Sequence, residues 1–195
     1  MTDAARESAQ HFAGEPDGFE RLWTPHRMAY IKGDGTPATA DAAEDADGVE
    51  DADGAGCPFC RAPRRDDEEG LIVARGSTAY VVLNLFPYNP GHLMVCPYRH
   101  VADYPDLTDE ETQEVARLAQ RAMRVLSAAS QPHGFNLGMN QGRVAGAGIA
   151  EHLHQHVVPR WGGDSNFLPI VARTKALPEL LSETRRRLAE AWRST

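Results

Sequence analysis

The stretch Glu151-His152-Leu153-His154-Gln155-His156-Val157-Val158-Pro159-Arg160-Trp161 sets three histidines at strict alternation before two valines. Alternate side chains of a β-strand point to the same face, so this spacing predicts a strand with three imidazoles in one row. Neighbouring rings would lie about 6.5–7 Å apart, whereas on a helix they would spread over roughly 200° and could not share a ligand. Packing histidines or a metal-chelating tract are the alternatives. Neutral imidazole is an effective nucleophile, which favours a reactive row that contacts a phosphorylated substrate.

The pattern His-φ-His-φ-His-φ-φ resembles that of the histidine triad family of nucleotide hydrolases and transferases. The match runs from His152 to Val158, with Gln155 where the family usually has an apolar residue. The resemblance implies an α+β fold, in which an antiparallel β-sheet carries a long packed helix and a C-terminal helix, and a homodimer or dimer-built oligomer. It also implies that His154 attacks the α-phosphorus of a nucleoside polyphosphate, that His156 binds the phosphate and assists the leaving group, and that His152 orients the row.

Composition and charge limit the possible partners and the number of domains. The chain has 195 residues, a formal charge of −8 and a pI near 5.4, which argues against nucleic acid or an anionic membrane as a partner. We expect a flexible arm over residues 1–18 and a single domain over 19–195, interrupted by a disordered acidic insertion at about 32–56. Seven acids and no base lie between Asp41 and Asp53. The start of the chain lacks the apolar core of a signal peptide, so we expect a cytoplasmic protein.

Cys57 and Cys60 form a Cys-x-x-Cys pair directly after the insertion, and the chain has three cysteines in all. An odd number suits a reducing compartment, with a metal or redox pair rather than a disulfide scaffold. A zinc site needs two more ligands, and His100 and His152 are available. Many histidine triad proteins and the related galactose-1-phosphate uridylyltransferases build such a site. The resemblance therefore implies a structural zinc bound by Cys57, Cys60, His100 and His152, with unligated or redox thiols as the alternatives.

Apolar periodicity predicts the remaining elements. Strands are expected at 71–75 and 78–84 around a Gly76-Ser77 turn, and at 92–97 and 135–140. Thr108-Asp109-Glu110-Glu111 is a capping box that opens a helix with an apolar stripe from Val115 to Ala129. A short strand near 168–172 precedes a C-terminal helix over 178–192. One face of that helix would consist of Leu180, Leu181, Thr184, Leu188 and Trp192.

Two further segments resemble substrate-binding parts of the family. In the family the residue that matches Asn84 contacts the ribose and the one that matches His92 lies near the nucleotide, although Asn84 also fits a strand-ending turn. A glycine-rich loop starts at Asn140, and glycines let backbone amides approach a phosphate closely. By resemblance Asn140 contacts the phosphate and Gly146 lies beside it. Gly148 stands where family members often carry Gln or Ser, so its backbone amide would have to substitute.

The flanking segments resemble one branch of the family, the actinobacterial diadenosine tetraphosphate phosphorylases. These segments are Trp161 to Asp164, with Trp161 as a further substrate-binding candidate, Arg21 to Pro25 and Asn84 to His92. The resemblance implies phosphorolysis of diadenosine tetraphosphate to ATP and ADP through a covalent nucleotidyl-histidine, with inorganic phosphate as co-substrate. One alternative is a hydrolase of dinucleoside polyphosphates or adenosine phosphoramidates from the same family. Another is a nucleotide-binding regulatory module, which Gly148 and the acidic insertion favour.

Overall fold

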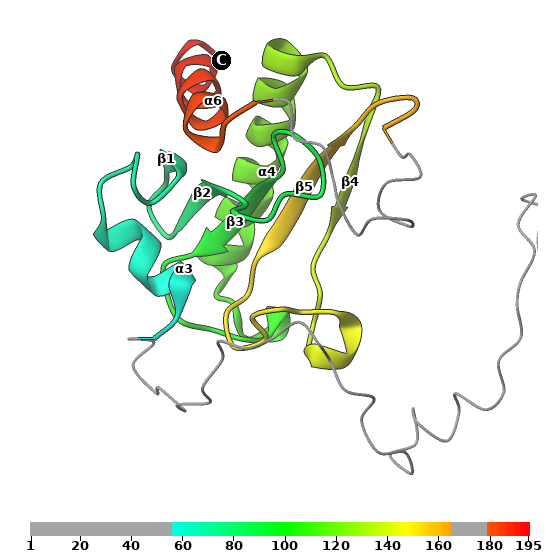
Figure 1. Ribbon diagram of the computed structural model, residues 1–195. Helices are drawn as coiled ribbons and strands as arrows, with labels where there is room; N and C mark the ends of the chain where they lie inside the picture. Colours follow the sequence, from blue (N-terminus) through cyan, green and yellow to red (C-terminus); the bar gives the residue numbers. More distant parts are fainter. Residues whose placement is uncertain (1–55, 165–178) are drawn as a thin grey trace, which may run out of the picture. The chain divides into compact units, whose positions relative to one another are not determined.

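The computed structural model describes residues 56–164 and 179–195, where a five-stranded antiparallel sheet runs in the order β1-β2-β3-β5-β4 (Figure 1). The predicted α+β fold is thereby confirmed. Predictions for the arm, for the insertion up to residue 55 and for a strand near 168–172 lie outside the described residues. Among the described residues, no helix combines the length and the apolar character that spanning a bilayer requires. The strands are β1 Ile72–Arg75, β2 Ala79–Leu83, β3 Leu93–Pro97, β4 Gly134–Gly138 and β5 Gln155–Arg160.

The central strands are buried on both faces, and their side chains divide between two apolar clusters. In β2, Ala79, Val81 and Leu83 belong to one cluster, whereas Tyr80 and Val82 belong to the other. This is the alternation that a strand imposes, because successive side chains point to opposite faces. Every residue of β2 and β3 is buried. The sheet therefore needs cover on both sides.

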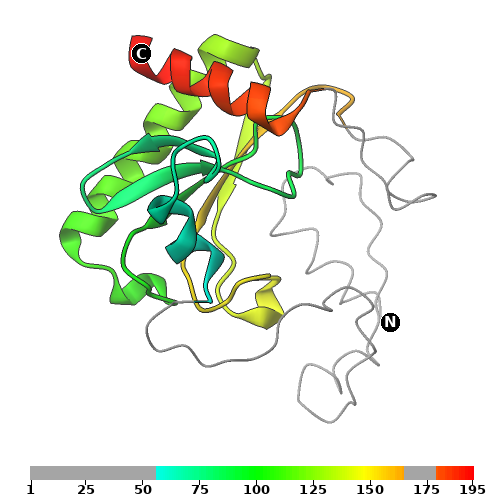
Figure 2. The same cartoon turned by 60° about the vertical axis from the view of Figure 1, so that its left-hand side comes forward.

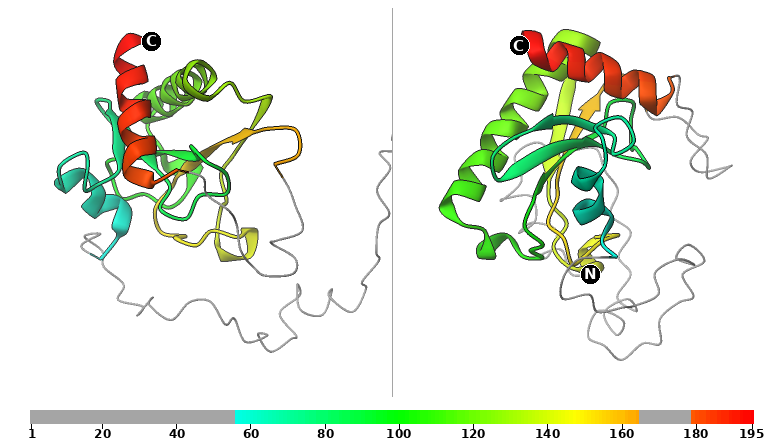
Figure 3. Two further views of the ribbon diagram at one scale, coloured as in Figure 1. Left: turned by 45° about the horizontal axis from the view of Figure 1, so that its top comes forward. Right: turned by 90° about the vertical axis from the view of Figure 1, so that its left-hand side faces the viewer.

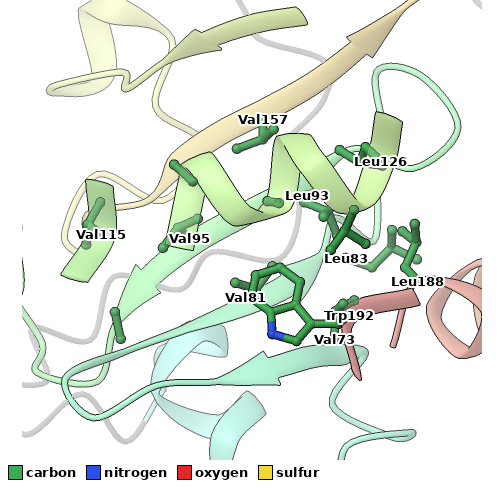
Figure 4. Close-up of a cluster of buried hydrophobic side chains, with 14 residues drawn as sticks. Val73, Val81, Leu83, Leu93, Val95, Val115, Leu126, Val157, Leu188 and Trp192 are labelled. Carbon is green, nitrogen blue, oxygen red and sulfur yellow. The ribbon is translucent and has the colours of Figure 1, made fainter. Parts of the chain in front are cut away.

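The long helix α4, Asp109–Ser130, covers one face of the sheet (Figure 4). It begins with the predicted capping box, in which Thr108 accepts a hydrogen bond from Glu111 N and the Glu111 carboxylate accepts one from Thr108 N. These bonds satisfy backbone donors that a helix start leaves without partners. The buried stripe confirms the periodicity predicted from the sequence: Val115, Ala119, Ala122, Val125 and Leu126.

The C-terminal helix α6, Leu181–Ser194, packs beside α4 over the same apolar cluster (Figure 2). Thr184, Leu188 and Trp192 are buried, as predicted. Leu180 was expected on the same face, but it is the N-cap and 69% exposed. That prediction is wrong because the helix begins at Leu181, three residues later than the predicted start at 178. The guanidinium of Arg121 lies 4.9 Å above the Trp192 ring and joins the two helices.

The opposite face of the sheet is covered by the Cys-x-x-Cys segment, which forms α3, Pro58–Arg61, and the 3₁₀ helix η1, Ala62–Arg64 (Figure 3). Phe59 packs against Tyr80 and Met94 in the second apolar cluster. The Tyr80 hydroxyl donates a hydrogen bond of 2.5 Å to the carbonyl oxygen of Phe59. This contact fixes α3 to the sheet.

The predicted Gly76-Ser77 turn joins β1 to β2, and a carboxylate from α4 holds it. Glu114 accepts hydrogen bonds from the backbone N–H groups of Ser77, Thr78 and Ala79 and from the Thr78 hydroxyl. A Cβ added at Gly76 would lie 2.8 Å from the backbone carbonyl oxygen of Ala79, so glycine is needed there. The turn thus depends on a residue far away in the sequence.

Several strand boundaries differ from the predictions, and the start of β5 is the difference that affects the histidines. β4 ends at Gly138, before Asn140, and β5 begins at Gln155 and not at His152. Upstream of β5 the chain leaves the sheet ladder, because Leu153 N donates a 2.7 Å hydrogen bond to the carbonyl oxygen of Val101. Only the third histidine of the row therefore lies in a regular strand.

Candidate active site

His154 and His156 line one cavity of about 620 Å³ on the face of the sheet that α3 covers. His156 comes from β5, opposite Met94 of β3, and His154 comes from the segment just before the strand. Their ring centroids lie 4.9 Å apart, closer than the about 6.5–7 Å expected for a regular strand. The rings approach because His154 precedes the ladder and its ring is turned by a hydrogen bond to the carbonyl oxygen of His152. Much of the remaining lining is apolar: Phe59, Leu71, Val82, Leu83, Leu85, Phe86, Met94 and Ile149.

The hydrogen bonds of His154 fix its tautomer. Its Nδ1 lies 2.8 Å from the carbonyl oxygen of His152, which can only accept, so Nδ1 carries the proton and donates. Nε2 therefore has a free lone pair. Burial lowers the pKa of His154 below its usual value, so the ring is neutral at pH 7. This is the form in which imidazole acts as a nucleophile.

His156 has the opposite tautomer, which is set through His92. Tyr88 N donates a 3.0 Å hydrogen bond to Nδ1 of His92, so the proton of His92 is on Nε2. That Nε2 lies 2.9 Å from Nδ1 of His156 and donates to it, which leaves the proton of His156 on Nε2. Burial, with a smaller contribution from His154, lowers the pKa of His156 to about 4. The two neighbouring rings thus offer one lone pair and one N–H donor.

His152 points away from this cavity, into a cluster with Cys57, Cys60 and His100. Its Nε2–H donates a 3.0 Å hydrogen bond to the carbonyl oxygen of Pro97, which leaves a lone pair on Nδ1. Nδ1 lies 3.4 Å from both cysteine sulfurs and 3.3 Å from Nδ1 of His100. All four donor atoms lie within 4.8 Å of one another. The four residues predicted as ligands therefore come together, and they could hold a metal ion.

Burial keeps the Cys60 thiol and the His152 imidazole neutral when no cation is bound. Burial, and then the neighbouring Cys57, raises the pKa of the Cys60 thiol to about 11. Burial lowers the pKa of His152 to about 4, although its bond to Pro97 opposes the shift. Without a cation the thiolate is unfavourable, whereas a metal ion stabilises the thiolate and the neutral imidazole together.

Phe59 is a site residue that the sequence reasoning missed. Its ring centroid lies 5.5 Å from that of His152 and 4.8 Å from that of His154. It thus separates the Cys/His cluster from the cavity and forms part of the cavity wall. Its position between Cys57 and Cys60 was the signal that could have pointed to it, since the ligands fix everything between them.

The predicted substrate-binding residues fall into two groups. Asn84, Gly146 and Gly148 line the cavity. Asn84 also accepts a hydrogen bond from the N–H of residue 86, so the turn interpretation holds as well. Gly146 has a φ of 91°, which favours glycine, whereas a Cβ at Gly148 would meet nothing within 4 Å.

His92, Asn140 and Trp161 do not line the cavity. His92 is fully buried behind His156, so a direct nucleotide contact does not fit its position. The Asn140 side chain donates a 3.3 Å hydrogen bond to the Gly146 carbonyl oxygen and supports the loop from behind. Trp161 follows the far end of β5, and its Nε1–H donates to the carbonyl oxygen of Ser130. Sequence resemblance identified these positions but could not locate them relative to the cavity.

Fold, histidine pair and Cys/His cluster together define a histidine triad protein, and the chain belongs to the HIT family, since the HIT domain model matches residues 66–163. The chain is 50% identical over 194 residues to the AP-4-A phosphorylase of Mycobacterium tuberculosis. The aligned region covers 98% of this chain and 95% of that protein. A hypothetical histidine triad nucleotide-binding protein from Sulfolobus tokodaii superposes with a TM-score of 0.60 at 27% identity, over 71% of this chain and 93% of that chain. A Zn-bound histidine triad family protein from Mycobacterium smegmatis gives a TM-score of 0.56 at 26% identity, over 71% and 94%.

Proposed function

We propose that this protein is a diadenosine tetraphosphate phosphorylase that works through a covalent nucleotidyl-histidine on His154. The observation that carries the proposal is the 50% identity, over 98% of the chain, to the mycobacterial AP-4-A phosphorylase. The geometry supports it, because the cavity combines a nucleophilic lone pair with a neighbouring N–H donor. The apolar walls suit an adenine ring, and we assign the ribose contact to Asn84 at the edge of the cavity.

In the first step Nε2 of His154 attacks the α-phosphorus of the dinucleotide. The bond from that phosphorus to the bridging oxygen breaks, and ATP leaves while AMP stays bound to the histidine. His156 donates its Nε2–H to the departing oxygen, which reduces the negative charge that develops there. Backbone amides in the loop that contains Gly146 and Gly148 stabilise the α-phosphate.

In the second step an oxygen of inorganic phosphate attacks the same phosphorus. The N–P bond breaks, His154 is released as neutral imidazole, and ADP forms. One dinucleotide and one phosphate therefore give one ATP and one ADP. Water as the second nucleophile would give AMP in place of ADP.

Cys57, Cys60, His100 and His152 would hold a zinc ion with a structural role. Zn–S bonds of about 2.3 Å and Zn–N bonds of about 2.0–2.1 Å in a tetrahedron require S···N separations of about 3.5 Å and an N···N separation of about 3.3 Å. The measured S···N distances of 3.3 and 3.4 Å and the N···N distance of 3.3 Å fit these values. When bound, zinc supplies a cross-link between α3 and the triad segment. Thiolate ligands need a reducing compartment, which supports the predicted cytoplasmic location.

We also propose that the protein assembles as a homodimer or a dimer-built oligomer through β4. This strand lies at the edge of the sheet, and Leu137 on it is 47% exposed. An open edge with an apolar side chain favours pairing with a second copy. Light scattering should give a multiple of the 21.3 kDa chain mass, and Leu137→Lys should shift it towards the monomer. A monomeric wild-type protein would contradict this.

The experiment that tests the proposed function is chromatography of diadenosine tetraphosphate after incubation with the protein, with and without inorganic phosphate. ATP and ADP that appear only with phosphate are the expected products. ATP and AMP without phosphate would make the protein a hydrolase, and no turnover would favour the binding module. His154→Ala should abolish turnover. His133→Ala is the matched control, because His133 lies outside the cavity lining and contacts the loop after β5.

A further inference from the structure

Two arginines, Arg61 and Arg65, line the same cavity as His154 and His156, and both are exposed. Neither is ion-paired within residues 56–164 and 179–195. Five of the fourteen arginines in these ranges are paired with a carboxylate, so the feature that sets Arg61 and Arg65 apart is their place in the lining of this cavity. The lining holds a single carboxylate, Glu69. Within the lining the two guanidinium groups outnumber the one carboxylate, although Asp66, Asp67 and Glu68 follow Arg65 directly in the sequence.

The backbone that carries these arginines is fixed beside the nucleophile. Phe59, in the same short segment, packs on His154 with ring centroids 4.8 Å apart. Arg75 donates hydrogen bonds of 3.0 and 3.2 Å to two main-chain oxygens of the segment. Gly70 approaches so closely that an added Cβ would lie 2.6 Å from a third main-chain oxygen. The arginine side chains therefore start from a rigid support in the wall of this cavity.

The geometry of phosphoryl substitution defines where a second anion must bind. The entering and leaving groups lie on opposite sides of the phosphorus, roughly in line. When His154 enters, the polyphosphate of the leaving ATP departs on the far side. When His154 leaves, its replacement must enter from that same far side. One subsite therefore serves first the leaving polyphosphate and then the second nucleophile.

We propose that Arg61 and Arg65 form this subsite, so that they hold the leaving triphosphate in the first step and inorganic phosphate in the second. The inference rests on the proposed function and adds the residues that select phosphate over water. Arginine suits this task, because its planar guanidinium donates two parallel hydrogen bonds to phosphate oxygens. Water has no charge to bind there, so a bound phosphate outcompetes it for the nucleotidyl-histidine. The Cys-x-x-Cys segment thereby links the metal cluster to the choice of acceptor.

The test measures the ratio of ADP to AMP formed from diadenosine tetraphosphate over a range of phosphate concentrations. Arg61→Gln, Arg65→Gln and the double variant are compared with wild type. The control is Arg64→Gln, because Arg64 lies in the same segment but lines a separate cavity of about 320 Å³. The ratio is set after the covalent intermediate forms, so it does not depend on the amount of folded protein or on the rate of the first step.

We expect the phosphate concentration that gives equal ADP and AMP to rise about tenfold for each guanidinium removed, since a hydrogen bond to a charged group contributes at least that factor. Arg64→Gln should match wild type. A wild-type ratio in the double variant would overturn the proposal. If wild type makes no ADP, the proposed function fails, and calorimetry with inorganic tripolyphosphate decides the subsite separately. Weaker binding of tripolyphosphate to the double variant, but not to Arg64→Gln, would support the proposed subsite. Equal binding to all of these proteins would refute it.

Discussion

Replacement of His92 tests whether the tautomer of His156 controls catalysis, and two variants separate the bonds that its Nδ1 accepts from Tyr88 N and Asn84 Nδ2 from the bond that its Nε2 donates to His156. The amide oxygen of asparagine lies close to the position of histidine Nδ1. His92→Asn therefore keeps the acceptor for Tyr88 N–H and removes the donor to His156. The amide nitrogen of glutamine reaches the position of Nε2, so His92→Gln keeps the donor and loses the acceptor.

The size of the effect follows from the burial of this pair. His92 is fully buried, and its Nε2 lies 2.9 Å from Nδ1 of His156. Leaving that buried Nδ1 without a donor costs about 1–3 kcal/mol. If the proton moves from Nε2 to Nδ1 instead, the departing oxygen loses its donor. A barrier raised by this amount corresponds to a loss of about 5- to 150-fold in kcat/KM for His92→Asn.

The assay compares diadenosine tetraphosphate with the p-nitrophenyl ester of AMP, whose leaving group needs no proton. His92→Asn should lose activity mainly with the dinucleotide, and His92→Gln should lose less activity but more stability in urea unfolding. Equal losses of His92→Asn with both substrates, or equal kcat/KM for the two variants with the dinucleotide, would refute the assignment of the proton to Nε2 of His156.

Three further predictions follow from the structure. Because burial lowers the pKa of the nucleophile His154 below its usual value of 6.5, the loss of kcat on acidification should be centred below pH 6.5; a fall centred at or above pH 6.5 in the pH profile would contradict this. Burial alone would raise the pKa of Glu114, but its bonds to Thr78, Ser77 and Ala79 lower it from 4.5 to about 2. Glu114→Gln should therefore lose about 2–3 kcal/mol in urea unfolding at pH 7, and the difference from wild type should vanish as the pH falls from 4.5 towards 2, whereas a pH-independent difference would point to packing alone. Cys60→Ser should lower the zinc content measured by mass spectrometry of untagged protein and reduce the melting temperature; a wild-type protein without zinc would remove the metal site.

Several features of this protein depend on local sequence alone, and the structure confirms them. The capping box at Thr108 and the stripe that begins at Val115 placed α4, because helix starts and helix faces are set by residues three and four positions apart. Apolar runs and a glycine turn placed β1, β2 and β3, since a strand needs only side chains that alternate between two buried faces. The triad spacing indicated the family, and the order of Cys57, Cys60, His100 and His152 indicated the cluster.

Contacts between distant segments decided what the site does. The triad alone predicted one row of three rings, but the bond from Leu153 to Val101 takes the chain out of the ladder and turns His152 into a different cluster from His154 and His156. No sequence pattern states which nitrogen of a histidine bears its proton, because the tautomer depends on which group faces each nitrogen after folding. The positions of Phe59, Arg61 and Arg65 were also decided by tertiary structure. Resemblance transfers residue types and local spacing, whereas burial, tautomers and cavity walls arise only when remote segments pack together.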